Sequence, residues 1–278
     1  VMRAEEWLPS TPRHLQLFEA LGFEPPKFAH LPMIMGPDRA KLSKRHGATA
    51  IGEYIVDGYL PEALLNFMVL LGWSLDDKTD VVSSQTVTDN FTLDRVTKSS
   101  AIFDQKKLLW MNGMYIRELT PDQLAAAMTP FLERDLPKDM LPVDEEYLRR
   151  IAPLLQERIK RLDESADITE YFFRANETFN TDDLVQKGMD RDSTLSALNA
   201  ALDDLSGADD FQHEKLEEML TATGEKLELS RRQFFGVLRV AATGRAVSPP
   251  LFEMMEVMGK DRTVSRVNNA VERFSAAG

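Results

Sequence analysis

Apolar residues recur at helical spacing along most of the chain, and capping residues, Gly or Pro separate successive apolar runs. Thr120-Pro121 and Asp144 each open a run with a side chain that can cap a helix. Pro153 lies inside the run from Glu145 to Leu162 and lacks a backbone donor, so it should kink or split that helix. The pattern predicts a mainly helical chain. Seven further segments are predicted helices by the same spacing: residues 61–71, 167–173, 192–205, 211–223, 231–242, 251–258 and 262–274.

Local capping signals place some helix ends more closely. Ser84 can cap a short helix, and Asp104 can cap a helix that we expect Asn112-Gly113 to break or bend. Ser230 and Gly244 mark the two ends of a later helix, since a hydroxyl suits an N-cap and glycine suits a left-handed C-terminal residue.

Large side chains at apolar helical positions are expected in the core. Trp73 and Trp110 occupy such positions, so we expect them to be buried rather than to stack on a base. Met254, Met255 and Met258 are likewise expected to fill the core, because the flexible thioether side chain adapts to irregular gaps.

The first fifty residues have a different pattern. Ser10-Thr11-Pro12 begins a helix that Gly22 ends, and its predicted apolar face consists of Leu15, Phe18 and Leu21. Residues 28–35 are apolar and extended in character, and Gly36-Pro37-Asp38 ends them with a turn. This succession of helix, strand and loop is typical of the end of an α/β nucleotide-binding domain, without the other strands that a complete parallel sheet needs.

The most distinctive polar stretch is Lys41-Leu42-Ser43-Lys44-Arg45-His46-Gly47, in which four cationic or potentially cationic side chains and one hydroxyl occur in seven residues. A loop of this kind after a strand suits a phosphate-rich ligand, because ammonium groups can stabilise charge that develops on phosphates. By itself, the same composition also describes a solvated basic loop.

Composition restricts the class of protein. The chain has 278 residues, 43% of them hydrophobic and 28% charged, which is typical of a globular protein of two or three domains. The absence of cysteine excludes disulfides and thiolate zinc sites. We find no apolar run of about 18 residues and no signal-peptide pattern, so we expect a cytoplasmic protein without membrane contact.

The charge distribution qualifies the net charge of −12, which by itself opposes nucleic-acid binding. Residues 1–50 contain seven Lys or Arg against five acids, and residues 149–161 contain five against one. Such basic islands on an acidic protein are compatible with RNA contact at a few defined places, although most charge runs are simply solvated faces.

Several blocks of sequence together resemble the bacterial glutamyl-tRNA synthetase family of class I aminoacyl-tRNA synthetases. Lys41 to Arg45 is similar to the Lys-Met-Ser-Lys-Ser signature loop of that class. The resemblance runs along the whole chain in the family's order. The other blocks are Val1-Met2-Arg3-Ala4-Glu5-Glu6-Trp7-Leu8 followed by Ser10-Thr11-Pro12, then Tyr59-Leu60-Pro61-Glu62-Ala63-Leu64, Leu71-Gly72-Trp73-Ser74, Phe103-Asp104 through Trp110-Met111-Asn112-Gly113, Thr243-Gly244, and Pro249-Pro250-Leu251-Phe252-Glu253.

The chain departs from the family in one respect. Members carry an N-terminal half of the nucleotide-binding domain with a His-x-Gly-His-type motif, and nothing in this sequence matches it. No two of the four histidines, His14, His30, His46 and His213, have that spacing, and the chain begins at Val1 without an initiator Met. We therefore expect a C-terminal portion of a longer synthetase that is inactive by itself.

The resemblance implies a fold and four domains. It implies a remnant of an α/β Rossmann-type catalytic domain in residues 1–47 and a helical stem-contact region in residues 48–120. An all-α anticodon-binding domain would follow as two subdomains, residues 121–178 and 179–278. The helical pattern after Thr120 favours the bacterial glutamyl type, because eukaryotic-type and glutaminyl enzymes continue into β-barrels.

The resemblance also implies roles at the ATP site. Lys44, Lys41 and Ser43 would contact the ATP phosphates, with the two lysines as catalytic groups. Glu6 and Trp7 would lie near the adenosine, although Trp7 could equally be a core residue. The backbone of Ile34 would meet the adenine, with an ordinary buried strand residue as the alternative.

Arg3 matches the arginine that binds the glutamate substrate in the family, although an ion pair with Glu5 or Glu6 is the simpler interpretation of the residue. Arg158 aligns with the arginine that reads the third anticodon base, and Gln156 is its competitor if the register slips. The basic run around them is expected to contact tRNA. It comprises Arg149, Arg150, Arg158, Lys160 and Arg161.

The sequence therefore predicts part of a glutamate–tRNA ligase that would use ATP and Mg²⁺, with Mg²⁺ entering as the ATP complex and no protein-bound metal. Its partners would be tRNA-Glu, glutamate and ATP, and we expect a monomer. Two alternatives remain: a non-catalytic tRNA-binding module, and an unrelated helical protein with a basic loop that binds no tRNA.

Overall fold

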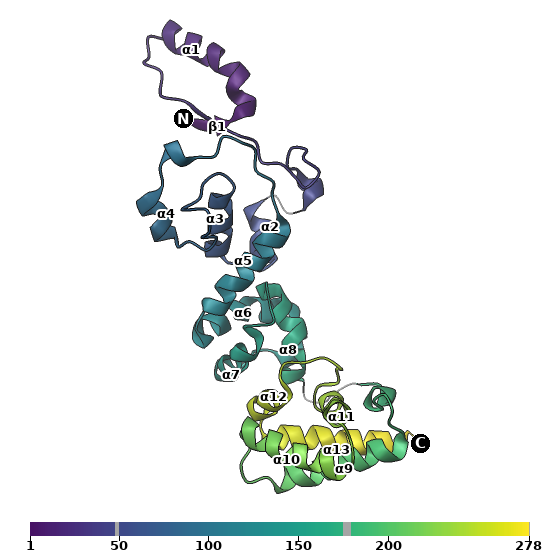
Figure 1. The fold of residues 1–278 in the computed structure, drawn as a ribbon. Coiled ribbons are helices and arrows are strands. Elements are labelled where there is room, and N and C mark those ends of the chain that lie inside the picture. Colours follow the sequence, from purple (N-terminus) through teal and green to yellow (C-terminus); the bar gives the residue numbers. More distant parts are fainter. Residues whose placement is uncertain (48–49, 175–178, 278) are drawn as a thin grey trace. The chain divides into compact units, whose positions relative to one another are not determined.

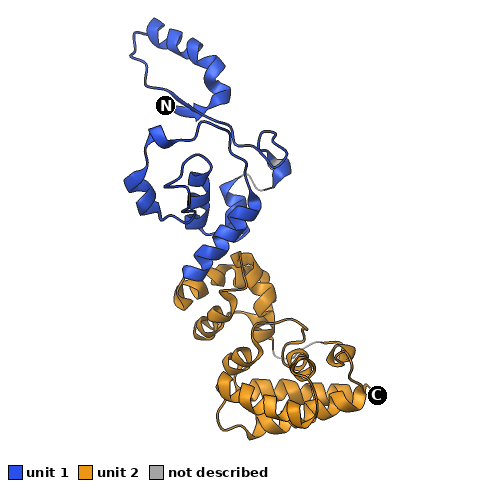
Figure 2. Ribbon diagram, viewed as in Figure 1, with its two compact units in different colours: residues 1–118 blue, residues 119–278 orange. Residues whose placement is uncertain are grey.

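The computed structural model describes residues 1–47, 50–174 and 179–277, apart from the side chain of Lys44. It divides into two compact units, residues 1–118 and residues 119–278 (Figure 2). Thirteen α-helices and a two-stranded sheet lie within the described ranges, so the prediction of a mainly helical chain is confirmed (Figure 1). No helix in these ranges has the length and apolar composition needed to cross a bilayer.

Unit 1 begins with a small parallel sheet. Strand β1 (Met2–Ala4) pairs with β2 (Ala29–Leu31) in parallel, with Arg3 opposite His30. The short 3₁₀ helix η1 (Glu5–Ser10) and helix α1 (Thr11–Ala20) connect the two strands (Figure 1). A parallel pair needs such a crossover connection, and this one matches the predicted helix–strand succession.

The predicted apolar face of α1 is not buried. Leu15 and Leu21 are 41% and 59% exposed, and α1 has no buried residue. The predicted helix is confirmed, and its apolar face is exposed within this chain.

The rest of unit 1 is helical. Its elements are η2 (Lys44–His46), α2 (Ile51–Val56), α3 (Pro61–Leu70), α4 (Ser84–Asn90), η3 (Leu93–Arg95) and α5 (Gln105–Glu118). Helices α3 and α5 pack together around a core of Tyr54, Phe67, Phe103, Leu108 and Met111. Leu42 of the basic loop and Ile34 pack against this same core, so hydrophobic contacts hold the base of the loop.

Two expected helix ends in unit 1 are wrong. Helix α5 runs through Asn112-Gly113 without a break, because the buried Asn112 side chain accepts a hydrogen bond from Leu60 N at 2.8 Å and donates to Gly58 O at 3.3 Å. Ser83 rather than Ser84 caps α4, since its Oγ accepts from the N–H of Thr86. The cap by Asp104 is confirmed: its carboxylate accepts from Lys106 N and Lys107 N at 2.9 and 3.2 Å.

Unit 2 opens with a group of helices around a leucine-rich core. It comprises α6 (Pro121–Asp135), η4 (Lys138–Met140), α7 (Glu145–Leu155), η5 (Leu162–Glu164) and α8 (Ser165–Phe173). Thr120 and Asp144 cap α6 and α7 as predicted. The predicted run from residue 145 to residue 162 is split, because α7 ends two residues after Pro153.

A second helical group completes unit 2. It comprises η6 (Thr181–Leu184), α9 (Arg191–Gly207), α10 (His213–Lys226), α11 (Arg231–Thr243), α12 (Leu251–Met258) and α13 (Lys260–Ala276). Helix α9 packs along α13 and also contacts α10 and α11 (Figure 1). Ser230 caps α11 and Gly244 ends it at φ +71°, so both predicted boundaries are confirmed.

The large side chains divide between core and surface. Trp73 is 2% exposed, and Met254, Met255 and Met258 are buried, as predicted. Trp110 is 41% exposed, so its expected burial is wrong: within α5 it lies next to the buried Met111 but on a different face.

Candidate nucleotide and RNA sites

The basic loop is anchored at its base by backbone hydrogen bonds. Leu42 N donates to Ile34 O at 3.0 Å, and Gly36 N donates to Ala40 O at 2.8 Å, which closes the turn predicted at residues 36–38. Met35 N donates to Ala101 O, and Phe103 N donates to Met35 O, both at 2.8 Å. The loop is therefore tied to a segment about sixty residues later in the chain.

The structure brings together several residues predicted for the ATP and glutamate sites. The Lys41 ammonium contacts the Glu6 carboxylate, and both side chains are partly exposed. The Arg3 guanidinium lies over the Trp7 ring, 4.6 Å from its centroid. Because β1 is paired with β2, these residues and the loop after β2 share one region of unit 1.

The contacts of Arg3 and Trp7 bear on two alternatives from the sequence: an ion pair of Arg3 with a neighbouring glutamate, and core packing of Trp7. Arg3 stacks on Trp7, and the described residues give it no ion pair with Glu5 or Glu6. Trp7 is 41% exposed, so it is not a core residue of this chain. Both side chains are thus accessible to a ligand, and an exposed cation–π contact contributes only about 0.5–1 kcal/mol, which a ligand carboxylate can replace.

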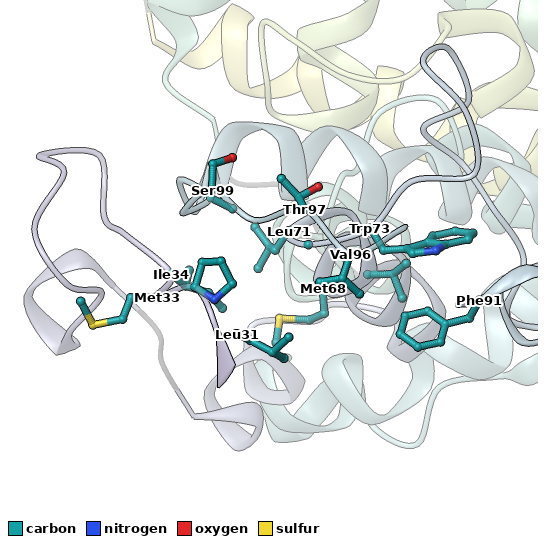
Figure 3. A pocket seen from close by; sticks show the side chains of 14 residues that line it. Leu31, Met33, Ile34, Met68, Leu71, Trp73, Phe91, Val96, Thr97 and Ser99 are labelled. Atoms are coloured by element: carbon teal, nitrogen blue, oxygen red, sulfur yellow. The ribbon is translucent and has the colours of Figure 1, made fainter. Parts of the chain in front are cut away.

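Ile34 lies beyond the end of β2, with a half-buried side chain. Its carbonyl accepts from Leu42, whereas its N–H has no hydrogen-bond partner among the described residues. The side chain lines an apolar cavity of about 230 Å³ together with Met68, Leu71 and Trp73 (Figure 3). The N–H without a partner among the described residues is compatible with the predicted backbone contact with adenine.

Ser43 and Lys44 lie at the start of η2. Ser43 N donates to His46 Nδ1 at 3.0 Å, and Ser43 Oγ lies 3.3 Å from the same nitrogen. The backbone of Lys44 begins η2, and its side chain lies outside the described part of the structure.

In unit 2, the basic run after Glu145 is mostly engaged within the protein. Arg149 pairs with Asp122 at 3.1 Å, and Arg161 pairs with Asp163 at 3.0 Å. Arg150 donates to the carbonyl of Glu256 at 3.2 Å. These contacts account for three of the five cations, so the run as a whole is not a free RNA-binding face.

Arg158 differs from its neighbours. It is exposed, it lies in the turn after α7 rather than on the predicted helix, and it has no ion pair or hydrogen bond from its guanidinium among the described residues. Gln156, the competing residue, is half-buried, and its amide donates to Leu119 O. The structure therefore favours Arg158 over Gln156 as the residue that can reach a ligand.

Arg239 is a cation of the same region that sequence reasoning missed. It lies half-buried on α11, and its buried Nε has no partner among the described residues. Burial and the like charge of Arg158 lower the pKa of Arg239. The buried hydroxyl of Tyr171 also has no partner, and burial raises its pKa. A single arginine within the apolar run Phe234 to Ala242 was the sequence signal for this site.

Two uncompensated guanidinium groups and a buried hydroxyl favour an anionic or hydrogen-bond-accepting ligand, because such a ligand relieves the repulsion between like charges and pairs the unused donors. Nucleic acid offers phosphates and base edges of this kind.

In the described ranges, no group of three or more His, Asp or Glu side chains is placed to hold a metal ion.

Comparison with known families agrees with the division of the chain into unit 1 and unit 2. Residues 123–271 match the family "Anticodon binding domain", and residues 1–110 match "tRNA synthetases class I (E and Q), catalytic domain". Among solved structures, a glutamate tRNA ligase from Elizabethkingia meningosepticum, crystallised with its amino acid, superposes with a TM-score of 0.82 at 30% identity. That match covers 98% of this chain and 56% of the other.

Curated relatives give the same result. The glutamate–tRNA ligase of Dehalococcoides mccartyi is 47% identical over 99% of this chain and 57% of its own length, and that of Roseiflexus castenholzii is 45% identical over the full chain and 55% of its own length. The chain thus spans little more than half the length of these relatives. It belongs to the glutamate–tRNA ligase family of class I tRNA synthetases, of which it carries part of the catalytic domain and an anticodon-binding domain.

Proposed function

We propose that this chain is the part of a glutamate–tRNA ligase that supplies the ATP signature loop and the binding sites for tRNA-Glu. The observation that carries the proposal is the grouping of Arg3, Glu6, Trp7 and Lys41 beside the β1–β2 pair, within a chain that also contains an anticodon-binding domain. As part of this proposal, the protein acts as a monomer in the cytoplasm. The division into domains at residues 47, 120 and 178 also stays a prediction, and residues 48 and 178 lie outside the described ranges.

In the proposed reaction, the glutamate carboxylate attacks the α-phosphate of ATP, which enters with Mg²⁺. Glutamyl-adenylate forms and pyrophosphate leaves, after which a hydroxyl of the terminal tRNA ribose takes the glutamyl group and AMP departs. Lys41, Ser43 and Lys44 would stabilise the growing negative charge on the phosphates. Lys41 would exchange its exposed ion pair with Glu6, worth about 0–1 kcal/mol, for the phosphate contact.

Substrate recognition follows the same chemistry. The planar guanidinium of Arg3 would leave Trp7 to pair with the glutamate side-chain carboxylate, for which its donors have the right geometry. The free N–H of Ile34 would donate to the adenine ring, and Glu6 and Trp7 would lie beside the adenosine.

The test compares the chain with a chimera in which the portion of the Dehalococcoides mccartyi ligase outside the match is joined to residues 1–278. We expect ATP–pyrophosphate exchange from the chimera and none above background from the chain alone. Placement of both substrates can supply about 7–11 kcal/mol of a reaction barrier, and a partial site cannot provide this.

The two rival functions give different results. A chimera that binds tRNA-Glu but exchanges no pyrophosphate indicates a non-catalytic tRNA-binding module. A chain that binds no tRNA contradicts both the ligase and the module. Exchange by the chain alone at the chimera's rate contradicts the assignment of this chain as an incomplete site.

A further prediction concerns Arg158, which we propose reads the third anticodon base, C in tRNA-Glu and G in tRNA-Gln. A splayed cytosine offers acceptors to a guanidinium, whereas guanine presents donors on its Watson–Crick edge. A well-made base contact is worth about 1–3 kcal/mol of discrimination. We therefore compare two stem-loops, one whose anticodon ends in G and one whose anticodon ends in C. Arg158→Gln should lower the ratio of the Kd for the first to the Kd for the second by about tenfold.

Binding of the two stem-loops to residues 1–278 measures this effect without catalysis. Arg149→Gln is the matched control, because Arg149 belongs to the same basic run and is paired with Asp122. We expect that control to keep the ratio. Equal weakening of both stem-loops by Arg158→Gln would instead assign Arg158 to a phosphate and reject base reading.

A further inference from the structure

The ring of His46 is packed inside the base of the basic loop, although the loop itself is exposed. Only 9% of this side chain is accessible. Ser43 N donates to its Nδ1 at 3.0 Å, and His46 N in turn donates to Ser43 O at 2.8 Å. The two residues therefore close the single turn of η2 from both the side chain and the backbone.

This geometry assigns the tautomer of the ring. Because the backbone N–H of Ser43 can only donate, Nδ1 must accept and carries no proton. The proton of the neutral ring is then on Nε2, which lies 3.1 Å from Asp38 Oδ1 and donates to it. Arg45 Nε is also oriented to donate to Nε2, at the longer distance of 3.3 Å, and this contact competes with a proton on Nε2. The shorter contact of Nε2 with the charged Asp38 carboxylate, which also accepts from Arg45 Nη2 at 3.0 Å, favours the Nε2–H tautomer.

Asp38 is itself fixed for this role. Its Oδ1 accepts from Ala40 N at 2.9 Å, and this bond together with His46 holds the pKa of the Asp38 carboxyl below its usual value. Gly36 also packs against the imidazole ring: a Cβ atom at this position would lie 2.8 Å from it. The ring is thus enclosed by groups that fit one orientation.

The far end of the loop is held to α5. The carbonyl of His46 accepts from Gln105 Nε2 at 2.5 Å. Gly47 follows at φ +111°, where a Cβ atom would come within 2.2 Å of the same amide. The residue that fixes Ser43 is therefore also the point where the loop meets the helical part of unit 1.

We propose that His46 is a positioning residue, whose Nε2–H tautomer links the backbone N–H of Ser43 to Asp38 and so sets the conformation of the signature loop at Ser43-Lys44. This inference rests on the proposed function for its catalytic consequence alone. The ring touches no substrate; it acts by holding the backbone from which Ser43 and Lys44 extend.

The two ring bonds can be tested separately in residues 1–278. Asparagine places an amide oxygen near the position of Nδ1, and glutamine places an amide nitrogen near that of Nε2. His46→Asn should therefore keep the bond from Ser43 N–H, whereas His46→Gln should keep only the bond to Asp38. We expect protection of the Ser43 amide against hydrogen exchange to fall by about tenfold in His46→Gln and His46→Ala, and to persist in His46→Asn.

Nitrogen-15 NMR of the wild-type ring supplies a spectroscopic signature. With four histidines in the chain, the His46 signals can be assigned by comparison with the His46→Asn spectrum. The expected result is the Nε2–H tautomer. His14→Asn, a change on the exposed face of α1, is the control that should leave Ser43 protection unchanged. An Nδ1–H tautomer, or full protection of Ser43 in His46→Gln, would overturn the proposal.

The active chimera supplies the catalytic readout. His46→Gln and His46→Ala should lower kcat for pyrophosphate exchange by about tenfold with the KM for glutamate unchanged, and His46→Asn should restore kcat. Wild-type kcat in His46→Ala would contradict a positioning role. If the wild-type chimera is itself inactive, the proposed function fails, and the tautomer and the Ser43 exchange still decide the role of His46 in shaping the loop.

Discussion

Replacing Lys44 by alanine in the active chimera is expected to lower kcat for pyrophosphate exchange by about 10²–10³-fold, while the KM for glutamate changes little. Removal of one well-placed donor to developing charge has an effect of this size. The ammonium group would act on charge that grows on the phosphates as the carboxylate attacks, so its loss raises the transition-state energy more than the energy of bound substrate.

Pre-steady-state measurement of adenylate formation separates this step from binding and release. Lys98→Ala is a suitable control, because Lys98 is an exposed lysine of unit 1 outside the loop. We expect wild-type rates from the control. An unchanged rate of adenylate formation in Lys44→Ala would remove Lys44 from the proposed catalytic group.

Replacing Arg266 by methionine should lower the free energy of unfolding of unit 2 by about 3 kcal/mol or more. Arg266 is 3% exposed, and its guanidinium donates to the carbonyls of Ala242, Tyr171 and Arg174 at 2.8, 2.5 and 2.9 Å. Methionine keeps much of the side-chain volume but leaves buried acceptors without donors, at a cost of about 1–3 kcal/mol for each.

The chain contains its own internal reference for this measurement. All three tryptophans, Trp7, Trp73 and Trp110, lie in unit 1, so their fluorescence follows the unfolding of that unit. Urea titrations followed by far-UV circular dichroism also report the helices of unit 2. We expect Arg266→Met to shift only the dichroism transition, and the exposed Arg232→Met to shift neither signal by more than about 0.5 kcal/mol. A dichroism transition unchanged in Arg266→Met would contradict the proposed contribution of Arg266 to the stability of unit 2.

Local signals predicted the helices best. Thr120, Asp144, Ser230 and Gly244 act within a few residues of themselves, so their positions determine helix ends whatever the rest of the fold does. Asn112 misled the prediction for the opposite reason. Its turn-forming amide is used by the backbone of residues 58 and 60, and contacts over more than fifty residues cannot be seen in a local pattern.

The candidate ATP and RNA sites were likewise predicted where the sequence signal is local, and missed where it depends on the fold. The identity of the basic loop was visible in Lys41, Ser43 and Lys44, because the motif is continuous in sequence. The contact of Lys41 with Glu6, thirty-five residues away, depends on the pairing of β1 with β2. Arg239 was missed because it lies in an apolar helix that the sequence presents as ordinary core.

The bond between Gln105 and the carbonyl of His46 has a consequence for the order of folding. The two residues are 59 positions apart, and Met35 likewise pairs with Ala101 and Phe103. At synthesis rates of about 5–20 residues per second, the partners of the loop emerge on the order of 3–12 s after the loop itself. During translation, the contacts that hold the basic loop therefore become available only after most of unit 1 has been made.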